Sequence, residues 1–175
     1  PPPPPSAPPP PPAGPGGYAP AAAVEYAGWW RRVGAALIDG IIGWVFILPG
    51  AIMLFAGPTE VNFREDGFDG TGFYEEPTGT TLAIAILLYA IGGLAYLVVY
   101  CRMLGKGATW GRKAAGYRVL DARSMQPIGT GRAVGRYFAT ILSGLPCYLG
   151  FLWPLWDREK RTFHDMVVGT RAVKR

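Results

Sequence analysis

The chain has 175 residues, of which 50% are hydrophobic and only 17% are charged. So few charges are unusual in a soluble globular protein, and the composition predicts that lipid surrounds much of the chain. The net charge of +5 is compatible with a nucleic-acid binder. However, the basic residues follow apolar stretches and form no module with aromatic residues for stacking on bases. We therefore expect no nucleic-acid partner.

Residues 1–27 form a proline-rich segment, with twelve prolines among the first twenty residues, and Pro1, Pro5, Pro8 and Pro12 mark its densest part. Proline has no backbone donor for helix or sheet, so an extended polyproline II arm is expected. The arm is either a solvated tether or a segment that docks on the aromatic groove of a partner. Its polyproline start lacks the pattern of a cleaved signal peptide.

Three apolar stretches are each close to the roughly 20 residues that a helix needs to cross a bilayer. They cover residues 33–55, 81–101 and 137–156. We predict transmembrane helices over the first two. Trp29 and Trp30 precede the first helix, where an aromatic belt at the headgroup level is typical.

The charges divide unequally between the connecting segments. Residues 57–80 carry six acidic residues and one basic residue, whereas residues 102–136 carry eight basic residues and one acidic residue. Basic segments beside membrane spans stay in the cytoplasm. We therefore expect a multi-pass protein of the cell (inner or plasma) membrane. The amino terminus and the tail, residues 157–175, are placed inside, and the acidic loop outside. The basic residues are also expected to contact anionic lipid headgroups.

The third apolar stretch, residues 137–156, has basic flanks on both sides and Pro146 at its middle. If both flanks stay inside, the stretch enters from the cytoplasmic side as a helical hairpin and turns near Leu145-Pro146. A plain third span is the alternative. A short strand is expected in YRVLDA, residues 117–122. The predicted fold is an all-α integral membrane protein with this one cytoplasmic β element.

Asp39 stands inside the first apolar stretch, where an unpartnered carboxylate costs several kcal/mol. Arg32 precedes it by two helical turns, so both side chains share one face and Asp39 lies about 10 Å deeper. Tyr96 on the second helix is expected at a similar depth. We predict that the Tyr96 hydroxyl and a guanidinium, from Arg32 or Arg136, hold the Asp39 carboxylate in a pocket open to cytoplasmic water.

His164 is the only histidine of the chain. A general base needs a nucleophile and an orienting acid, and no serine or cysteine stands near it by spacing. We expect His164 to cap or anchor the turn before Asp165, and we expect no enzyme activity. The two cysteines lie in no CxxC or histidine-rich setting, so neither a metal site nor a cofactor is predicted.

Three blocks of the sequence carry a resemblance to a known family. WRRVGAALID resembles the first-helix signature of the RDD family of membrane proteins, an arginine followed by an alanine and an aspartate, here Arg32, Ala35 and Asp39. GATWGRKAAGYRVLDA resembles its middle block, a threonine-X-glycine-basic element before a strand. RTFHDMVVGTRAV resembles its closing block, so Asp165 matches the second aspartate. The resemblance covers residues 29–173, and some members, called proline-rich antigens, carry a proline-rich arm.

The resemblance implies a possible transporter of unknown ligands. The residues themselves favour a non-catalytic, membrane-embedded accessory or assembly subunit of a larger complex, of the kind that electron-transport complexes contain. Two or three helices leave no room for a substrate path in one molecule, and no second repeat is present. The alternative is a homo-oligomeric ion- or proton-coupled transporter that uses Asp39. Other membrane protein subunits, lipids and further copies of the chain are the expected partners.

Overall fold

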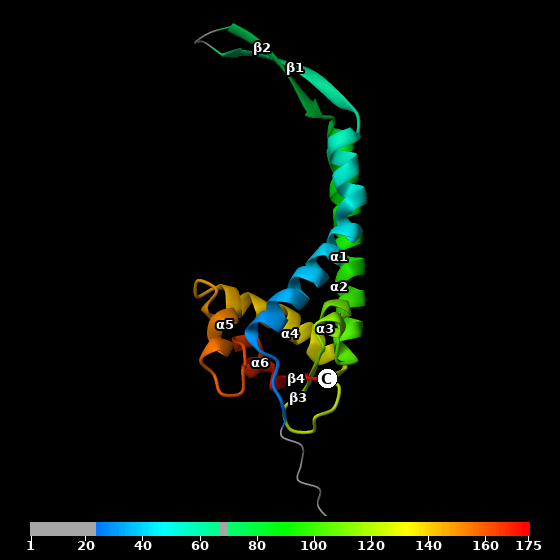
Figure 1. Cartoon of the computed structure of the whole chain (residues 1–175). Coiled ribbons are helices and arrows are strands. Elements are labelled where there is room, and N and C mark those ends of the chain that lie inside the picture. Colours follow the sequence, from blue (N-terminus) through cyan, green and yellow to red (C-terminus); the bar gives the residue numbers. More distant parts are fainter. Residues whose placement is uncertain (1–23, 67–69) are drawn as a thin grey trace, which may run out of the picture.

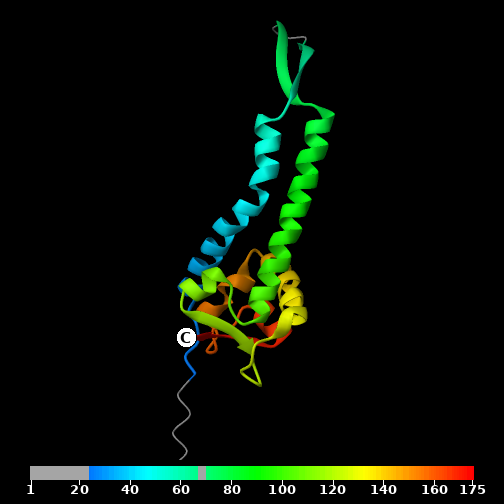
Figure 2. The same cartoon turned by 90° about the vertical axis from the view of Figure 1, so that its right-hand side faces the viewer.

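A computed structural model describes residues 24–66 and 70–175. The molecule is elongated, with two long helices side by side, a β hairpin at one end and shorter helices and strands at the other (Figures 1 and 2). We call these shorter elements, residues 110–174, the platform. The residues predicted to dock a partner, Pro1, Pro5, Pro8 and Pro12, lie outside the described part of the chain.

The two long helices are α1 (Trp29–Ala56) and α2 (Gly79–Gly105), and each is long and apolar enough to cross a membrane. Both extend about one turn farther toward the platform than the predicted 33–55 and 81–101. Pro49 lies inside α1 and removes one helical hydrogen bond, but the helix continues to Ala56. Figure 1 shows that the platform half of α1 leans away from the straighter α2.

Glycines allow the backbones of α1 and α2 to approach closely. A Cβ at Gly43 of α1 would lie 3.3 Å from the ring of Tyr96. Gly92 of α2 is so close to the Phe46 carbonyl oxygen that a Cβ there would overlap it. Such small-residue contacts are typical of helix pairs in membranes. The remaining faces of the pair expose large apolar side chains: Leu37, Ile41, Trp44, Val45, Ile52, Phe55, Leu82, Ile86, Leu87, Ile91 and Leu94.

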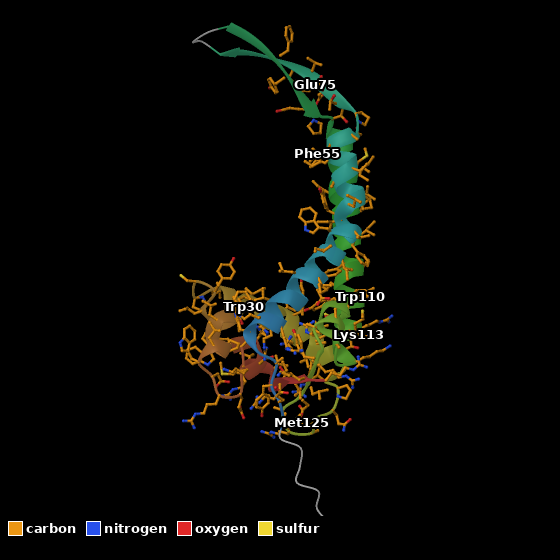
Figure 3. All side chains as sticks on the ribbon, viewed as in Figure 1. Trp30, Phe55, Glu75, Trp110, Lys113 and Met125 are labelled. Atoms are coloured by element: carbon orange, nitrogen blue, oxygen red, sulfur yellow. The ribbon has the colours of Figure 1, made fainter. Side chains whose placement is uncertain are left out.

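The acidic segment 57–80, predicted as a loop in an all-α fold, instead contains a β hairpin. β1 (Thr59–Asp66) pairs antiparallel with β2 (Gly70–Pro77), and Val61 lies opposite Glu75. The prediction considered only charge. Val61, Phe73 and Tyr74 are residue types that favour an extended backbone, which explains the strands. Figure 3 shows Glu75 on the hairpin, at the opposite end of the molecule from Lys113 on the platform.

A second small sheet organises the platform. β3 (Tyr117–Asp121) pairs antiparallel with β4 (Thr170–Lys174), so the middle and the end of the sequence lie together. Residues 25–27 run beside β4, with Tyr26 opposite Val173 and the Ala27 amide bonded to the Ala172 carbonyl at 2.8 Å. The arm predicted for residues 1–27 therefore extends too far, because residues 25–27 pack against the platform. The core beneath this sheet contains Ala27, Leu104, Val119, Ile128, Ala133 and Ala172.

The other platform elements are helical: α3 (Trp110–Ala114), α4 (Gly129–Gly144), α5 (Leu149–Leu152), a 3₁₀ turn (Trp153–Leu155) and α6 (Phe163–Val168). α4 and the α5 segment meet at 110°, and Cys147 and Tyr148 at the bend have positive φ angles. α4 begins well before residue 137, so Arg132 and Arg136 belong to this helix and not to a separate basic segment.

Gly92 and its neighbour Gly93 provide a matched test of the helix contact. Gly92→Ala should lower the free energy of unfolding in detergent by about 1–3 kcal/mol, because the added methyl overlaps the Phe46 carbonyl. Gly93→Ala should be neutral or stabilising, since nothing lies within 4 Å of a Cβ there and alanine favours helix. Thermal unfolding followed by circular dichroism measures both. Equal melting temperatures for the two variants would contradict the packing.

Candidate functional site

The Asp39 carboxylate is 5% exposed and is surrounded by donors from the segment after α2. The Thr109 hydroxyl donates to Oδ2 at 2.5 Å, and the Gly111 amide donates to Oδ1 at 2.8 Å. Arg112 Nη1 lies 3.5 Å from Oδ2. Thr109 and Gly111 stand at the beginning of α3, where backbone amides lack helical partners and are free to bind an anion. The short α3 is thereby held against the middle of α1.

Gly111 fits this position because no side chain has room there. A Cβ would overlap the Ala35 carbonyl oxygen and would lie 2.9 Å from Asp39 Cγ. Ala35 is itself 1% exposed, so the two backbones touch. The TWGR sequence therefore supplies a hydroxyl, a backbone amide and a guanidinium to Asp39, and its glycine also permits the close contact.

The predicted partners of Asp39 were wrong in two respects. Its guanidinium partner is Arg112, not Arg32 or Arg136, because α3 folds back beside Asp39 while the other two arginines turn to Asp165. The Tyr96 hydroxyl donates to the Asp39 carbonyl oxygen at 2.8 Å and not to the carboxylate.

Arg112 is buried at the centre of this cluster. Nη1 donates to the Thr109 hydroxyl oxygen at 2.8 Å, and Nη2 donates to the Tyr100 hydroxyl oxygen at 2.9 Å. Its Nε is buried without a hydrogen-bond partner among the described residues. Arg112 thus connects the platform to both long helices, through Asp39 of α1 and Tyr100 of α2.

Asp165 of α6 is completely buried and binds two arginines from different helices. Its Oδ2 lies 2.6 Å from Arg32 Nη1 of α1, and its Oδ1 lies 2.6 Å from Arg136 Nη2 of α4. The Thr170 hydroxyl also donates to Oδ1 at 3.0 Å, and the Thr162 amide donates to Oδ2 at 3.1 Å. Oδ2 therefore has two fixed donors and Oδ1 has three, since Arg136 Nε also donates to Oδ1 at 3.2 Å.

The arginines decide the charge of this second cluster. Burial alone would raise the pKa of Asp165, but the guanidiniums of Arg136 and Arg32 hold it well below its ordinary value. Arg32 also donates to the carbonyl oxygens of Ala27, at 3.2 Å, and Lys160, at 2.5 Å. The ion pairs consequently join α1, α4, α6 and the segments that flank the small sheet.

His164 does not cap α6, but it anchors the beginning of that helix on α4. Thr162 caps α6, whereas the His164 ring packs against Ser143 of α4, with Nδ1 2.9 Å from the serine oxygen. The Ser143 hydroxyl oxygen also accepts the His164 amide at 3.2 Å, and when the Ser143 hydroxyl donates to Nδ1 the neutral ring carries its proton on Nε2. Burial, followed by the charge of Arg136, lowers the pKa of His164 to about 3.

A cavity of about 310 Å³ lies between the two clusters. Its wall includes Arg32, Arg112 and Arg136, together with Tyr117 and His164. A second cavity of about 210 Å³ adjoins it and reaches Asp39, Tyr96 and Tyr100. The predicted polar residues are therefore gathered at one level of the molecule, but around two carboxylates and not one.

A profile of the RDD family matches residues 26–169. The chain belongs to the RDD family. It is 34% identical to the proline-rich antigen homolog of Mycobacterium tuberculosis over 85% of this chain and 63% of the relative. It is 32% identical to YxaI of Bacillus subtilis, over 84% of this chain and 96% of that protein. The proline-rich antigen of Mycobacterium leprae is 31% identical, over 83% of this chain and 59% of that protein.

The chain thus spans less than two thirds of the mycobacterial relatives. No solved structure matches it. Arg32, Asp39 and Asp165, the positions that resemble the family's arginine and two aspartates, form two separate clusters in the structure. Sequence reasoning missed the partners that complete them. The TWGR element, which resembles the family's middle block, could have indicated the residues that bind Asp39. The sequence spacing of the other contributing residues gave no such indication: Tyr100, Ser143, Thr162 and Thr170.

Removing the Thr109 hydroxyl tests the Asp39 cluster. Thr109→Val keeps the size of the side chain but leaves Asp39 Oδ2 and Arg112 Nη1 with only their long 3.5 Å contact to each other. The free energy of unfolding should fall by about 1–3 kcal/mol. Thr130→Val, at an exposed position at the start of α4, is the control and should change it little. Denaturant titration in detergent measures the free energy of unfolding of both variants. Equal free energies for the two variants would refute the assigned contacts.

His164 should make the stability depend on pH. The pKa of His164 is about 3 in the folded protein and about 6.5 in an unfolded chain, so the unfolded chain binds the proton first as the pH falls. Stability should be complete above pH 6.5 and should fall below it by about 1.4 kcal/mol per pH unit toward pH 3. His164→Asn should flatten the slope between pH 6.5 and 4.5, because the chain has no other histidine. An unchanged slope would disprove the assignment.

Proposed function

We propose that the protein is a non-catalytic, membrane-embedded accessory or assembly subunit of a larger membrane complex. The observation that carries the proposal is that fixed hydrogen-bond donors surround the two buried carboxylates. Asp165 has at least two donors on each oxygen, and Asp39 has Thr109, Gly111 and Arg112 around it. A group that carries protons or ions must exchange its partners. Donors fixed by the fold, from four segments around Asp165 and from residues 109–112 around Asp39, fit groups that hold an architecture.

The distribution of charge supports an orientation in the cell (inner or plasma) membrane. The platform and the adjoining end of α2 carry the basic residues of 102–136, and the hairpin end carries the acidic residues of 57–80. The positive-inside rule then places the platform, the tail and the amino terminus in the cytoplasm and the hairpin outside. The bent α4–α5 segment is proposed to enter the lipid from the cytoplasmic side without crossing.

Two surfaces are available for other membrane protein subunits. A two-stranded hairpin alone is marginally stable in water, so β1 and β2 gain from packing against another chain. The outer faces of α1 and α2 expose an apolar surface that either lipid or a partner helix covers. An electron-transport complex is one class of assembly with small subunits of this kind, and a second copy of the chain is another possible partner.

The alternative is an ion- or proton-coupled transporter built as a homo-oligomer. One observation favours it: Asp39 lines the smaller cavity, so its carboxylate is not sealed from every space. In that case Asp39→Asn would abolish proton or cation flux in reconstituted vesicles and leave the oligomer intact.

The decisive experiment isolates the tagged full chain from native membranes in mild detergent. We expect one species larger than the chain, with a different membrane protein in constant stoichiometry by quantitative mass spectrometry. Replacing residues 59–77 by a short glycine-serine linker should release that partner, whereas Lys113→Gln on the platform, the control, should retain it. A lone monomer would overturn the proposal. So would a homo-oligomer whose flux is lost in Asp39→Asn.

A further inference from the structure

The larger cavity presents an excess of positive charge. Three guanidiniums, of Arg32, Arg112 and Arg136, belong to its wall, and no carboxylate belongs to the wall among the described residues. Asp165 lies behind two of the arginines and Asp39 beside the third. Two buried cations, Arg112 and Arg136, and the partly buried Arg32 thus share two carboxylates. One positive charge is left over in a region of low dielectric, where an anion would be bound strongly.

The same wall contains hydrogen-bond donors that the protein leaves unused. Arg136 Nη1 and the Tyr117 hydroxyl make no hydrogen bond to another described residue, although Arg136 is 3% and Tyr117 4% exposed. His164 Nε2 is likewise without a partner in the described part of the chain. In the tautomer in which the Ser143 hydroxyl donates to Nδ1, Nε2 carries the proton. The three free groups are therefore all able to donate, which is the pattern that an anion requires.

The remaining wall is apolar and includes Trp29, Val33, Ala36 and Phe151. The cavity lies at the end of α1 where Trp29 and Trp30 mark the headgroup level, beside the exposed apolar face of the same helix. Its volume of about 310 Å³ is enough for a polar head but small for acyl chains. Free inorganic phosphate would use the donors but would gain nothing from the apolar part.

We propose that this cavity binds the phosphate head of an anionic phospholipid, whose acyl chains lie along the exposed apolar surface of α1. Arg136 Nη1, the Tyr117 hydroxyl and His164 Nε2 are the donors to the phosphate oxygens. Basic pockets at the cytoplasmic ends of transmembrane helices commonly hold such headgroups. The site involves only this chain. It therefore goes beyond the accessory role and is tested without a partner protein.

Native mass spectrometry of the purified full chain, delipidated in detergent, tests the site with phosphatidylglycerol and phosphatidylcholine of identical acyl chains. We expect phosphatidylglycerol to bind at least about tenfold more tightly. Tyr117→Phe, which removes only the hydroxyl, should weaken that binding about tenfold. Tyr148→Phe, an exposed position outside the cavity, is the matched control and should bind as the wild type does. His164→Asn, which keeps a group that can accept from Ser143 and removes Nε2, replaces Tyr117→Phe if the latter does not fold.

Equal affinity for the two lipids would overturn the proposal, and so would a folded Tyr117→Phe or His164→Asn that binds phosphatidylglycerol as the wild type does. A separate titration with inorganic phosphate distinguishes the source of the anion. Binding of phosphate that depends on Tyr117, with no gain from the lipid, would reject the phospholipid and leave free phosphate as the ligand. Because these measurements use the isolated chain, failure of the accessory role would leave their outcome unchanged.

Discussion

The arrangement of this protein depends on keeping two buried carboxylates charged. A carboxylate removed from water is tolerated only if donors fixed by the protein replace the water around it. Asp39 obtains its donors from α3, and Asp165 obtains them from α1 and α4. Each aspartate therefore binds segments that are distant in the sequence. The platform is positioned against the long helices because these charges must be satisfied, and apolar packing then fills the space between.

Arg32 shows how one side chain combines several of these connections. Its guanidinium donates to Asp165, to the Ala27 carbonyl before α1 and to the Lys160 carbonyl before α6. The planar fork of arginine suits three acceptors in different directions, whereas the single ammonium of a lysine would not reach them all. Arg32 consequently joins the beginning of α1, the edge of the small sheet and the tail.

The sequence predicted the features that depend on local pattern. The two long apolar helices follow from their length and composition, and the unfavourable position of Asp39 correctly indicated a polar cluster around it. It could not predict the pairing of charges. Asp39 and Arg112 are separated by 73 residues, and several arginines were equally plausible partners until the fold brought α3 onto α1. The hairpin was missed for a different reason: its acidic residues dominated the interpretation, although Val61, Phe73 and Tyr74 favour strands.

Three arginines around two aspartates also have a consequence for how the platform is held. Exact neutrality would need one more anion, and the unused donors of Arg136, Tyr117 and His164 surround the space where it would sit. A headgroup in that space would complete the network between α1, α4 and α6. The lipid would then stabilise the same interface that Asp165 stabilises. Membrane composition would in this way act on the position of the platform, and through it on any subunit that the platform contacts.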